Sequence, residues 1–308
     1  MRRREKIAIV LSGILLGAGA VLAPAAAADD QEPTVMAEYT IGQFNMAGGH
    51  KEHGKKGNEA PDALIRSVED RKPAFMTVQE ACQDWNARLE EKLPDYVVVF
   101  QPILGGSGEP SRCYHGGTLF GNALLARKDL GFDKSGVADY DLQSPQVREP
   151  REHRKMLCLK SEPQKTVACS AHLSVGNDSA SLAARRGEAA RAAGIIAGNY
   201  ADYKRFLGGD LNDDPLSGVA DNFYHPGYGR GAHGDFKEAD SPCGNQIKRG
   251  YVVWSLPPVW FWCRSGEDTH SQGKLDFLFT PPTVHVTWSD ATHAKHSDHS
   301  LLWAGVEI

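Results

Sequence analysis

Short apolar runs along this chain repeatedly border a polar side chain of a kind that enzymes use. Asn45 closes the run that begins at Glu38, and Glu80 directly follows the run Ala74–Gln79. Layered α/β folds place ligand sites at the edge where strands end, so residues far apart in the sequence can meet there. The side chains concerned are Asn45, Glu80, His172, Asp210, Asn212, Asp276, Asp298 and His299. Asp and Asn after a strand commonly cap a turn, so it is the combination in this order that points to chemistry.

Apolar periodicity divides the chain into short strands and amphipathic helices without an internal repeat. Helices are predicted over Ala60–Arg71, Trp85–Leu93 and Ser179–Gly198. Strands are predicted over Glu38–Met46, Ala74–Gln79, Tyr96–Phe100, Asn122–Ala126, Lys155–Lys160, Thr166–Ala171, Arg205–Gly208, Leu275–Phe279, Val284–Trp288 and Leu301–Val306. The polar stretch Asp129–Arg151 predicts a surface loop, and Asp214–Gln272 has few periodic signals. No composition shift marks a domain boundary, so we expect one domain of packed sheets with helices outside.

The first 28 residues have the layout of a secretory signal peptide. A basic start over Met1–Lys6 precedes the apolar stretch Ile7–Leu22, and Ala26–Ala28 offers a small-residue cleavage site. A membrane anchor is the alternative, but the apolar stretch is shorter than the ~20 residues that a span needs. We therefore expect cleavage after Ala28, a short linker over 29–37, a folded domain over 38–308 and a secreted protein.

Six cysteines lie beyond this leader, which favours three disulfides in an exported protein. The turn-rich segment Ser161–Gln164 joins two strand-like runs, and a hairpin there would bring Cys158 and Cys169 side by side. Sequential pairing then gives Cys82–Cys113, Cys158–Cys169 and Cys243–Cys263, although other pairings remain open. A zinc site is the competing interpretation, but the chain has no Cys-x-x-Cys pair.

The net charge argues against passive binding of nucleic acid. The whole chain has 34 Lys and Arg against 39 Asp and Glu, for a net charge of −5. The leader holds four basic side chains and one acidic side chain, so its removal leaves a net charge of −8. A protein that binds a phosphate backbone by charge alone is expected to be basic. An acidic protein can still act on a phosphodiester if metal ions and local cations line its cleft.

The ordered set of polar residues resembles the endonuclease/exonuclease/phosphatase superfamily, which includes deoxyribonuclease-I-like enzymes. The most specific motifs are Gly209-Asp210-Leu211-Asn212 and Ser297-Asp298-His299, and Gln79-Glu80 after an apolar strand adds to them. The resemblance runs from about Tyr39 to the C-terminus. It implies a four-layer α/β/β/α sandwich of two packed mixed sheets with outer helices, in a single catalytic domain with its site at the edge between the sheets.

The resemblance also implies a divalent metal ion. Glu80 is the expected ligand for Mg²⁺, with Asn45 and Asp298 nearby, directly or through waters. Mg²⁺ takes few protein oxygens and keeps several waters, which fits so sparse a set of ligands. Mn²⁺ and Ca²⁺ are the alternative metals.

The remaining residues receive roles in cleaving a P–O bond. Asp210 is expected to orient and deprotonate the attacking water, and Asn212 to hold that water or a phosphoryl oxygen. His299 would donate to the pentacovalent phosphate, with Asp276 fixing its tautomer. His172 would contact the phosphate from the other side.

Members of the family usually have a cation before the strand that leads to the first histidine motif. This chain offers Arg148, Arg151 and Arg154 for that position. Arg154 fits best because it directly precedes Lys155–Cys158. The alternative for all three is a solvated basic loop.

Two segments bear on the substrate. The loop Gly48–Asn58 contains His50, Lys51, His53, Lys55 and Lys56. Their charge suits a polyanion, unless the loop is merely solvated. The aromatic-rich segment Tyr251–Trp262 could enter a lipid bilayer, stack on bases, or form a packed wall. It precedes Asp276, whereas the interfacial hairpin of the family's lipid enzymes tends to precede the final Asp-His, which argues against a lipid substrate.

We therefore expect a secreted, monomeric, Mg²⁺-dependent nuclease that hydrolyses P–O bonds of DNA, with RNA as an alternative and no obligate protein partner. A sphingomyelinase-like phospholipase C acting on a phospholipid, or another phosphoesterase, is the second hypothesis. A non-catalytic binding protein is the third. It is disfavoured because none of the eight key positions has an inert side chain.

Overall fold

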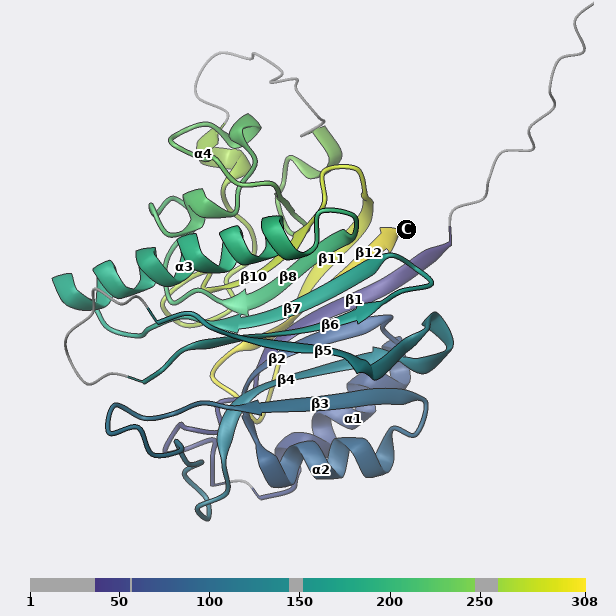
Figure 1. Cartoon of the computed structure of the whole chain (residues 1–308), viewed down its shortest axis with the longest axis vertical. Coiled ribbons are helices and arrows are strands. Elements are labelled where there is room, and N and C mark those ends of the chain that lie inside the picture. Colours follow the sequence, from purple (N-terminus) through teal and green to yellow (C-terminus); the bar gives the residue numbers. More distant parts are fainter. Residues whose placement is uncertain (1–36, 56, 144–151, 247–259) are drawn as a thin grey trace, which may run out of the picture. The chain divides into compact units, whose positions relative to one another are not determined.

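The computed structural model describes residues 37–55, 57–143, 152–246 and 260–308 (Figure 1). The predicted signal peptide, the linker up to residue 36, Lys56, Arg148, Arg151 and most of the aromatic-rich segment lie outside the described residues. No helix in the described ranges is long and apolar enough to cross a membrane.

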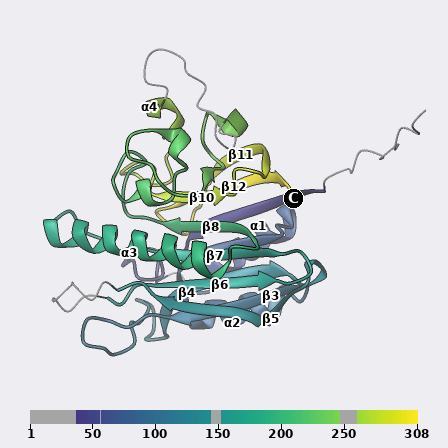
Figure 2. The ribbon, with the colours of Figure 1, turned by 45° about the horizontal axis from the view of Figure 1, so that its top comes forward.

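In the described part of the chain, two six-stranded sheets pack face to face (Figures 1 and 2). The first sheet has the order β11 (His285–His293), β12 (Ser300–Glu307), β1 (Glu38–Asn45), β2 (Phe75–Cys82), β4 (Phe120–Arg127), β3 (Tyr96–Pro102). The second has the order β5 (Phe132–Asp141), β6 (Lys155–Ser161), β7 (Thr166–His172), β8 (Lys204–Asp210), β10 (Asp276–Thr280), β9 (Lys237–Glu238). Both sheets are mixed, because β1 and β2 are parallel, as are β7 and β8, and the other neighbours are antiparallel.

Helices cover the outer faces of the two sheets. The α-helices are α1 (Glu59–Arg71), α2 (Gln83–Lys92), α3 (Ser179–Asn199) and α4 (Trp260–Cys263). Short 3₁₀ helices span η1 (Lys128–Leu130), η2 (Ala220–Asn222), η3 (Pro226–Tyr228) and η4 (Gly244–Gln246). Buried residues of α1 and α2 pack on the first sheet, and those of α3 pack on the second (Figure 2).

Alternation along the strands divides the core into three layers. Successive side chains of a strand point to opposite faces of its sheet. In β4, Leu124 and Ala126 therefore pack between the sheets, whereas Ala123 and Leu125 pack with α1 and α2. In β6, Leu157 likewise lies between the sheets. The result is the predicted four-layer α/β/β/α sandwich in one domain, and this prediction is confirmed.

The surface loop predicted over Asp129–Arg151 is wrong for much of its length. Phe132–Asp141 forms β5, an edge strand that pairs with β6, and most of its side chains are not buried. An edge strand with few buried positions has little of the apolar alternation that identifies a strand. For the same reason β11, the edge of the first sheet, continues past Trp288 to His293.

The predicted disulfide pairing is confirmed. The bonds are Cys82–Cys113, Cys158–Cys169 and Cys243–Cys263. Cys158 and Cys169 occupy paired positions of the β6–β7 hairpin, as its turn predicts. Cys82 is the last residue of β2, so its disulfide ties the end of this strand to the connection between β3 and β4.

Candidate active site

Three neighbouring strands of the second sheet present polar side chains at one edge. His172, the last residue of β7, is paired with Asp210, the last residue of β8. Because β10 runs antiparallel to β8, its first residue, Asp276, lies on the other side of Asp210. All three side chains are buried. Sheet register thus brings together residues that are widely separated in the sequence.

The facing edge of the first sheet contributes Asn45 and Glu80. Asn45, at the end of β1, donates from Nδ2 to Asp210 Oδ2 at 3.0 Å and lies 3.4 Å from Glu80 Oε1. Ser297 donates from Oγ to the carbonyl oxygen of Asn45 at 2.7 Å and accepts from the backbone N–H of His299 at 3.0 Å. These bonds attach the Ser297-Asp298-His299 motif to β1 and so to the same edge.

His299 and Asp210 form the electrostatic centre of the cluster. His299 Nδ1 lies 2.7 Å from Asp276 Oδ2, and His299 Nε2 lies 3.7 Å from Asp210 Oδ2. Burial lowers the pKa of His299, but the charge and hydrogen bond of Asp276, together with the charges of Asp210 and Asp298, outweigh burial and raise this pKa to about 10. Burial and the nearby charge of Asp276 raise the pKa of Asp210 to about 7. A protonated imidazole therefore faces a carboxyl group that exchanges its proton near neutral pH, as acid–base catalysis requires.

His172 is neutral in this environment. Asn212, held in the left-handed region at φ 51°, donates from Nδ2 to His172 Nε2 at 3.0 Å and to the carbonyl oxygen of Leu173 at 3.1 Å. Burial, with the charges of Arg154 and His299, lowers the pKa of His172 well below 6.5. Its ring also lies 3.7 Å from Asp210 Oδ2. His172 can therefore donate or accept a hydrogen bond here without adding charge.

Glu80 occupies a strained position in β2. Its φ of 50° places it in the left-handed region, and the register between β2 and β4 shifts between Val78 and Ala81. A non-glycine residue in this region costs on the order of 1–3 kcal/mol, and such strain concentrates at functional sites. Glu80 Oε2 accepts from the backbone N–H of Gly49 at 3.1 Å, and burial raises the pKa of its carboxyl group.

The donor set around Glu80 fits a hard divalent cation. Glu80 offers carboxylate oxygens, a ligand type that Mg²⁺ accepts while it keeps several waters. Asn45 faces Glu80 with its Nδ2, and its Oδ1 accepts from the backbone N–H of Ala47 at 2.9 Å, so Asn45 would contact the ion through a water or after its amide turns. Asp298, the third predicted ligand, lies beside two other groups: its Oδ2 is 3.6 Å from His270 Nε2 and 4.0 Å from His50 Nε2. His270 was not predicted, because its place directly before the turn that leads into β10 is a weak signal in the sequence.

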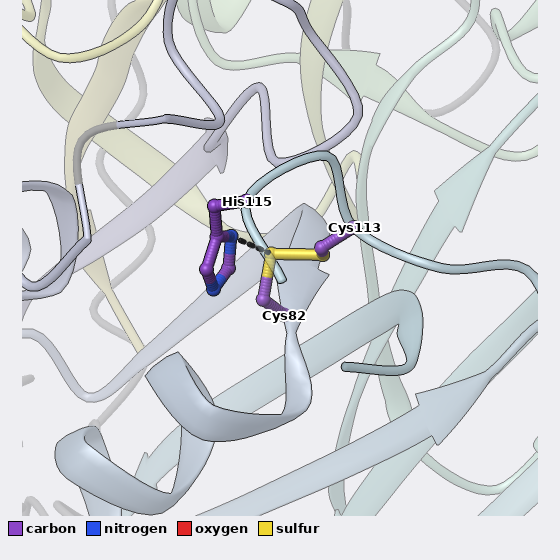
Figure 3. Close-up of side chains that lie close together, drawn as sticks. All are labelled: Cys82, Cys113 and His115. Carbon is purple, nitrogen blue, oxygen red and sulfur yellow. Dashed lines mark hydrogen bonds between the residues drawn. A yellow bond between two sulfur atoms is a disulfide. The ribbon is translucent and has the colours of Figure 1, made fainter. Parts of the chain in front are cut away.

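A second group of potential metal ligands does not qualify. Cys82, Cys113 and His115 lie close together, and Figure 3 shows His115 beside the Cys82–Cys113 bond. His115 Nδ1 is 3.8 Å from Cys82 Sγ, and His115 Nε2 is 2.8 Å from Asp84 Oδ2. Metal binding needs free thiolates, and both sulfur atoms are taken up by the disulfide.

Arg154 has an unusual buried guanidinium group. Its side chain is only 4% exposed, and its Nη2 lies 2.8 Å from Glu152 Oε2. Its Nε and Nη1 are buried and have no hydrogen-bond partner among the residues that the structure describes. Its charge lowers the pKa of both Glu80 and His172. Leaving charged donors unpaired is costly, and an anion such as a phosphate would satisfy them.

Comparisons with known proteins identify the family and the fold. A model of the Endonuclease/Exonuclease/phosphatase family matches residues 42–299. No curated protein sequence shows a significant match to the chain. The human Nocturnin catalytic domain, solved with a bound sulfate anion, has a TM-score of 0.62 at 15% identity, over 87% of this chain and 93% of its own.

Two further solved structures have the same fold at 15% identity. A mannosyl-6-phosphatase of Bacteroides thetaiotaomicron has a TM-score of 0.58, over 88% of this chain and 100% of its own. TDP2 of D. rerio, complexed with a single-strand DNA product, has a TM-score of 0.54 over the same shares of the two chains. Likeness at this identity concerns the fold alone.

The neutral, buried state of His172 predicts a pH dependence of stability. Its pKa in the folded protein lies below its value of 6.5 in the unfolded chain, so below pH 6.5 the unfolded state binds the extra proton. Stability from this group is complete above pH 6.5 and falls with decreasing pH, by at most about 1.4 kcal/mol per pH unit. Urea unfolding from pH 7 down to about pH 5 should show a shallower decline for H172Q than for wild type. The exposed His293 supplies the control, H293Q, which should follow the wild type. If the free energy of unfolding fell equally with pH in H172Q and in wild type, the lowered pKa of His172 would be contradicted.

Proposed function

The chain belongs to the endonuclease/exonuclease/phosphatase family, and we propose that it is a metal-dependent phosphodiesterase that hydrolyses P–O bonds of DNA. Members of this family are phosphodiesterases and phosphatases, and they generally depend on a divalent metal ion. The observation that most supports the proposal is the buried pair of Asp210 and His299, whose pKa values are raised to about 7 and about 10. A phosphodiester needs an activated water and a stabilised anionic phosphate, and this pair offers a group for each.

In this proposal Asp210 orients the attacking water and accepts its proton. Asn212 holds the water through Oδ1, or holds a phosphoryl oxygen after one of its two Nδ2 donations, to His172 or to the carbonyl oxygen of Leu173, is exchanged. His299 holds its proton on Nε2 and donates it toward the phosphate, because Asp276 occupies Nδ1. His172 contacts the phosphate from the second sheet as a neutral ring.

Two kinds of group would neutralise the negative charge of the phosphate. Arg154 directs its unpaired guanidinium N–H groups to the phosphate and neutralises part of its charge. Glu80, with Asn45 and Asp298, would hold the cation, which when bound supplies Lewis-acid stabilisation of the phosphate. We propose Mg²⁺ because the ligands are hard oxygens.

DNA is the substrate we favour. His50 reaches Asp298 from the loop after β1, so this loop, with Lys51, His53 and Lys55, borders the site. Such local cations would attract a polyanion despite the negative net charge. TDP2, with the same fold, is described with a single-strand DNA product. We also propose that the leader is removed after Ala28 and that the protein is secreted and monomeric.

Plasmid nicking tests the proposed activity. The purified protein should nick supercoiled plasmid with Mg²⁺ and lose this activity with chelator. D210N should lower kcat by about 10²–10⁴-fold, because it removes the general base. D70N is the matched control, since Asp70 is exposed on α1. Sphingomyelin liposomes and a sugar phosphate serve as competing substrates. Turnover of either without nicking would contradict DNA as the substrate, and no turnover at all would favour the binding-protein hypothesis.

Arg154 should matter for catalysis more than for folding. R154M removes donors that we assign to the phosphate, so kcat/KM on plasmid should fall by about 10–100-fold, the value of charged hydrogen bonds of 1.5–3 kcal/mol. Its melting temperature should stay the same or rise, because a buried and partly unpaired charge destabilises the fold. If R154M kept the wild-type kcat/KM, or lost much of its thermal stability, Arg154 would have a structural role instead of a catalytic one.

A further inference from the structure

The Asp298 carboxylate lies between two histidines that the proposed reaction does not use. His270 Nε2 is 3.6 Å, and His50 Nε2 4.0 Å, from the same oxygen, Asp298 Oδ2. His50 belongs to the loop after β1 in the first sheet, and His270 to the turn before β10 in the second. Asp298 thereby joins segments of both sheets at the edge where Glu80 and Asp210 also lie.

Backbone hydrogen bonds determine which ring nitrogen of each histidine carries the proton. The N–H of Gln272 donates to His270 Nδ1 at 3.1 Å, and the N–H of Glu52 donates to His50 Nδ1 at 3.2 Å. A ring nitrogen that accepts an N–H has no proton of its own, so the proton of each neutral ring is on Nε2. Both rings therefore present an N–H toward the carboxylate rather than a lone pair toward a metal ion.

This tautomer decides between two roles for His270. Ligand atoms of His270, Asp298 and His299 lie within 4.8 Å of one another, which alone would suit a metal ion. Ligation by His270 Nε2 would need the opposite tautomer and would break the hydrogen bond from Gln272. The arrangement favours His270 as a partner of the Asp298 carboxylate.

The structure holds His270 firmly. Its N–H donates to the carbonyl oxygen of Gly273 at 3.0 Å, and its carbonyl oxygen accepts from Gly273 at 2.9 Å. Its ring centroid lies 4.8 Å from that of His299. The preceding Thr269 accepts from the N–H of Ser300 at 2.7 Å and, through Oγ1, from the N–H of Asp276 at 3.0 Å. The turn is thus tied to β12, which directly follows His299, and to β10, which begins with Asp276.

We propose that His270 is a positioning residue that restrains Asp298 through Oδ2, so that Oδ1 would be available to the divalent cation. Carboxylates that ligate metals are commonly held by such neighbours, and the loss of one typically weakens metal binding by about 10–100-fold. At 3.6 Å the two atoms are beyond direct hydrogen-bond distance, so the restraint acts through the attraction between the ring N–H dipole and the carboxylate, or through one bridging water. His50, whose side chain is 43% exposed, supplies a second, weaker donor. The inference rests on the proposed function, because it takes Asp298 as a metal ligand.

Metal affinity tests this role directly. Titration calorimetry would give the Kd of the purified protein for Mg²⁺ and for Mn²⁺, in wild type, H270L, H270Q and the exposed control H293L. H270L should weaken the binding of Mg²⁺ and of Mn²⁺ by the same factor, about 10-fold or more. H270Q should keep most of the affinity, because its amide Nε2 reproduces the donor of the ring. H293L should match wild type.

Two results would contradict the role of His270 without contradicting the proposed function. A loss confined to Mn²⁺ would make His270 itself a ligand, since imidazole prefers transition metals to Mg²⁺. Unchanged affinities in H270L would show that Asp298 needs no such restraint. A wild type that binds neither metal would contradict the inference and the metal dependence of the proposed function together, and plasmid nicking with chelator separates this case. The thermal unfolding of each metal-free variant reports whether it is folded.

Discussion

Asp276 is a fully buried carboxylate at the contact between the two sheets, and both of its oxygens are engaged. Gln43 of the first sheet donates to Oδ1 at 2.7 Å, and His299 Nδ1 lies 2.7 Å from Oδ2. An unpaired charge at this depth would cost several kcal/mol, so both partners are needed for the sheets to pack in this way. The same bond turns His299 Nε2 toward Asp210. The buried charge of Asp276 therefore requires a partner in the core, and this pairing also orients His299, the group that we assign to the phosphate.

The features that suit the site for chemistry are unfavourable for the fold. Glu80 has a left-handed backbone, Arg154 has unpaired donors, and His172 is buried in its neutral form. Proteins tolerate such strain where the surrounding structure compensates for it. The Cys82–Cys113 disulfide lies two residues beyond Glu80, and a Cβ on Gly48 would come within 2.6 Å of Cys82 Sγ and 2.4 Å of the carbonyl oxygen of Glu80. This close packing around the disulfide supports the strained end of β2.

Sequence patterns predict those parts of the structure that depend on local burial. Strands buried on both faces, such as Thr166–Ala171, are correct because their apolar runs are continuous, and the Cys158–Cys169 pair follows from the hairpin turn. The edge strand β5 was missed, because side chains that face water need no apolar pattern.

The residues of the site likewise divide into those that a sequence pattern identifies and those that depend on tertiary contacts. Polar residues at strand ends could be listed from the sequence, and register brings His172, Asp210 and Asp276 together. Gln43 and His270 could not be found in this way, because their importance depends on one neighbour from a distant strand or turn. Burial of Arg154 is likewise a tertiary property that its sequence position does not reveal.

The protonation of His299 as a function of pH is the sharpest check on this electrostatic arrangement. Nitrogen-15 NMR of the metal-free protein, with His299 assigned by comparison with H299Q, reports the proton on each ring nitrogen as the pH is raised. The account predicts an imidazolium that persists well above pH 7 and loses its proton at about pH 10, with Nδ1–H held by Asp276. Titration near the ordinary value of 6.5 would contradict it, because Asp276 and Asp210 would then not form the electrostatic centre described here.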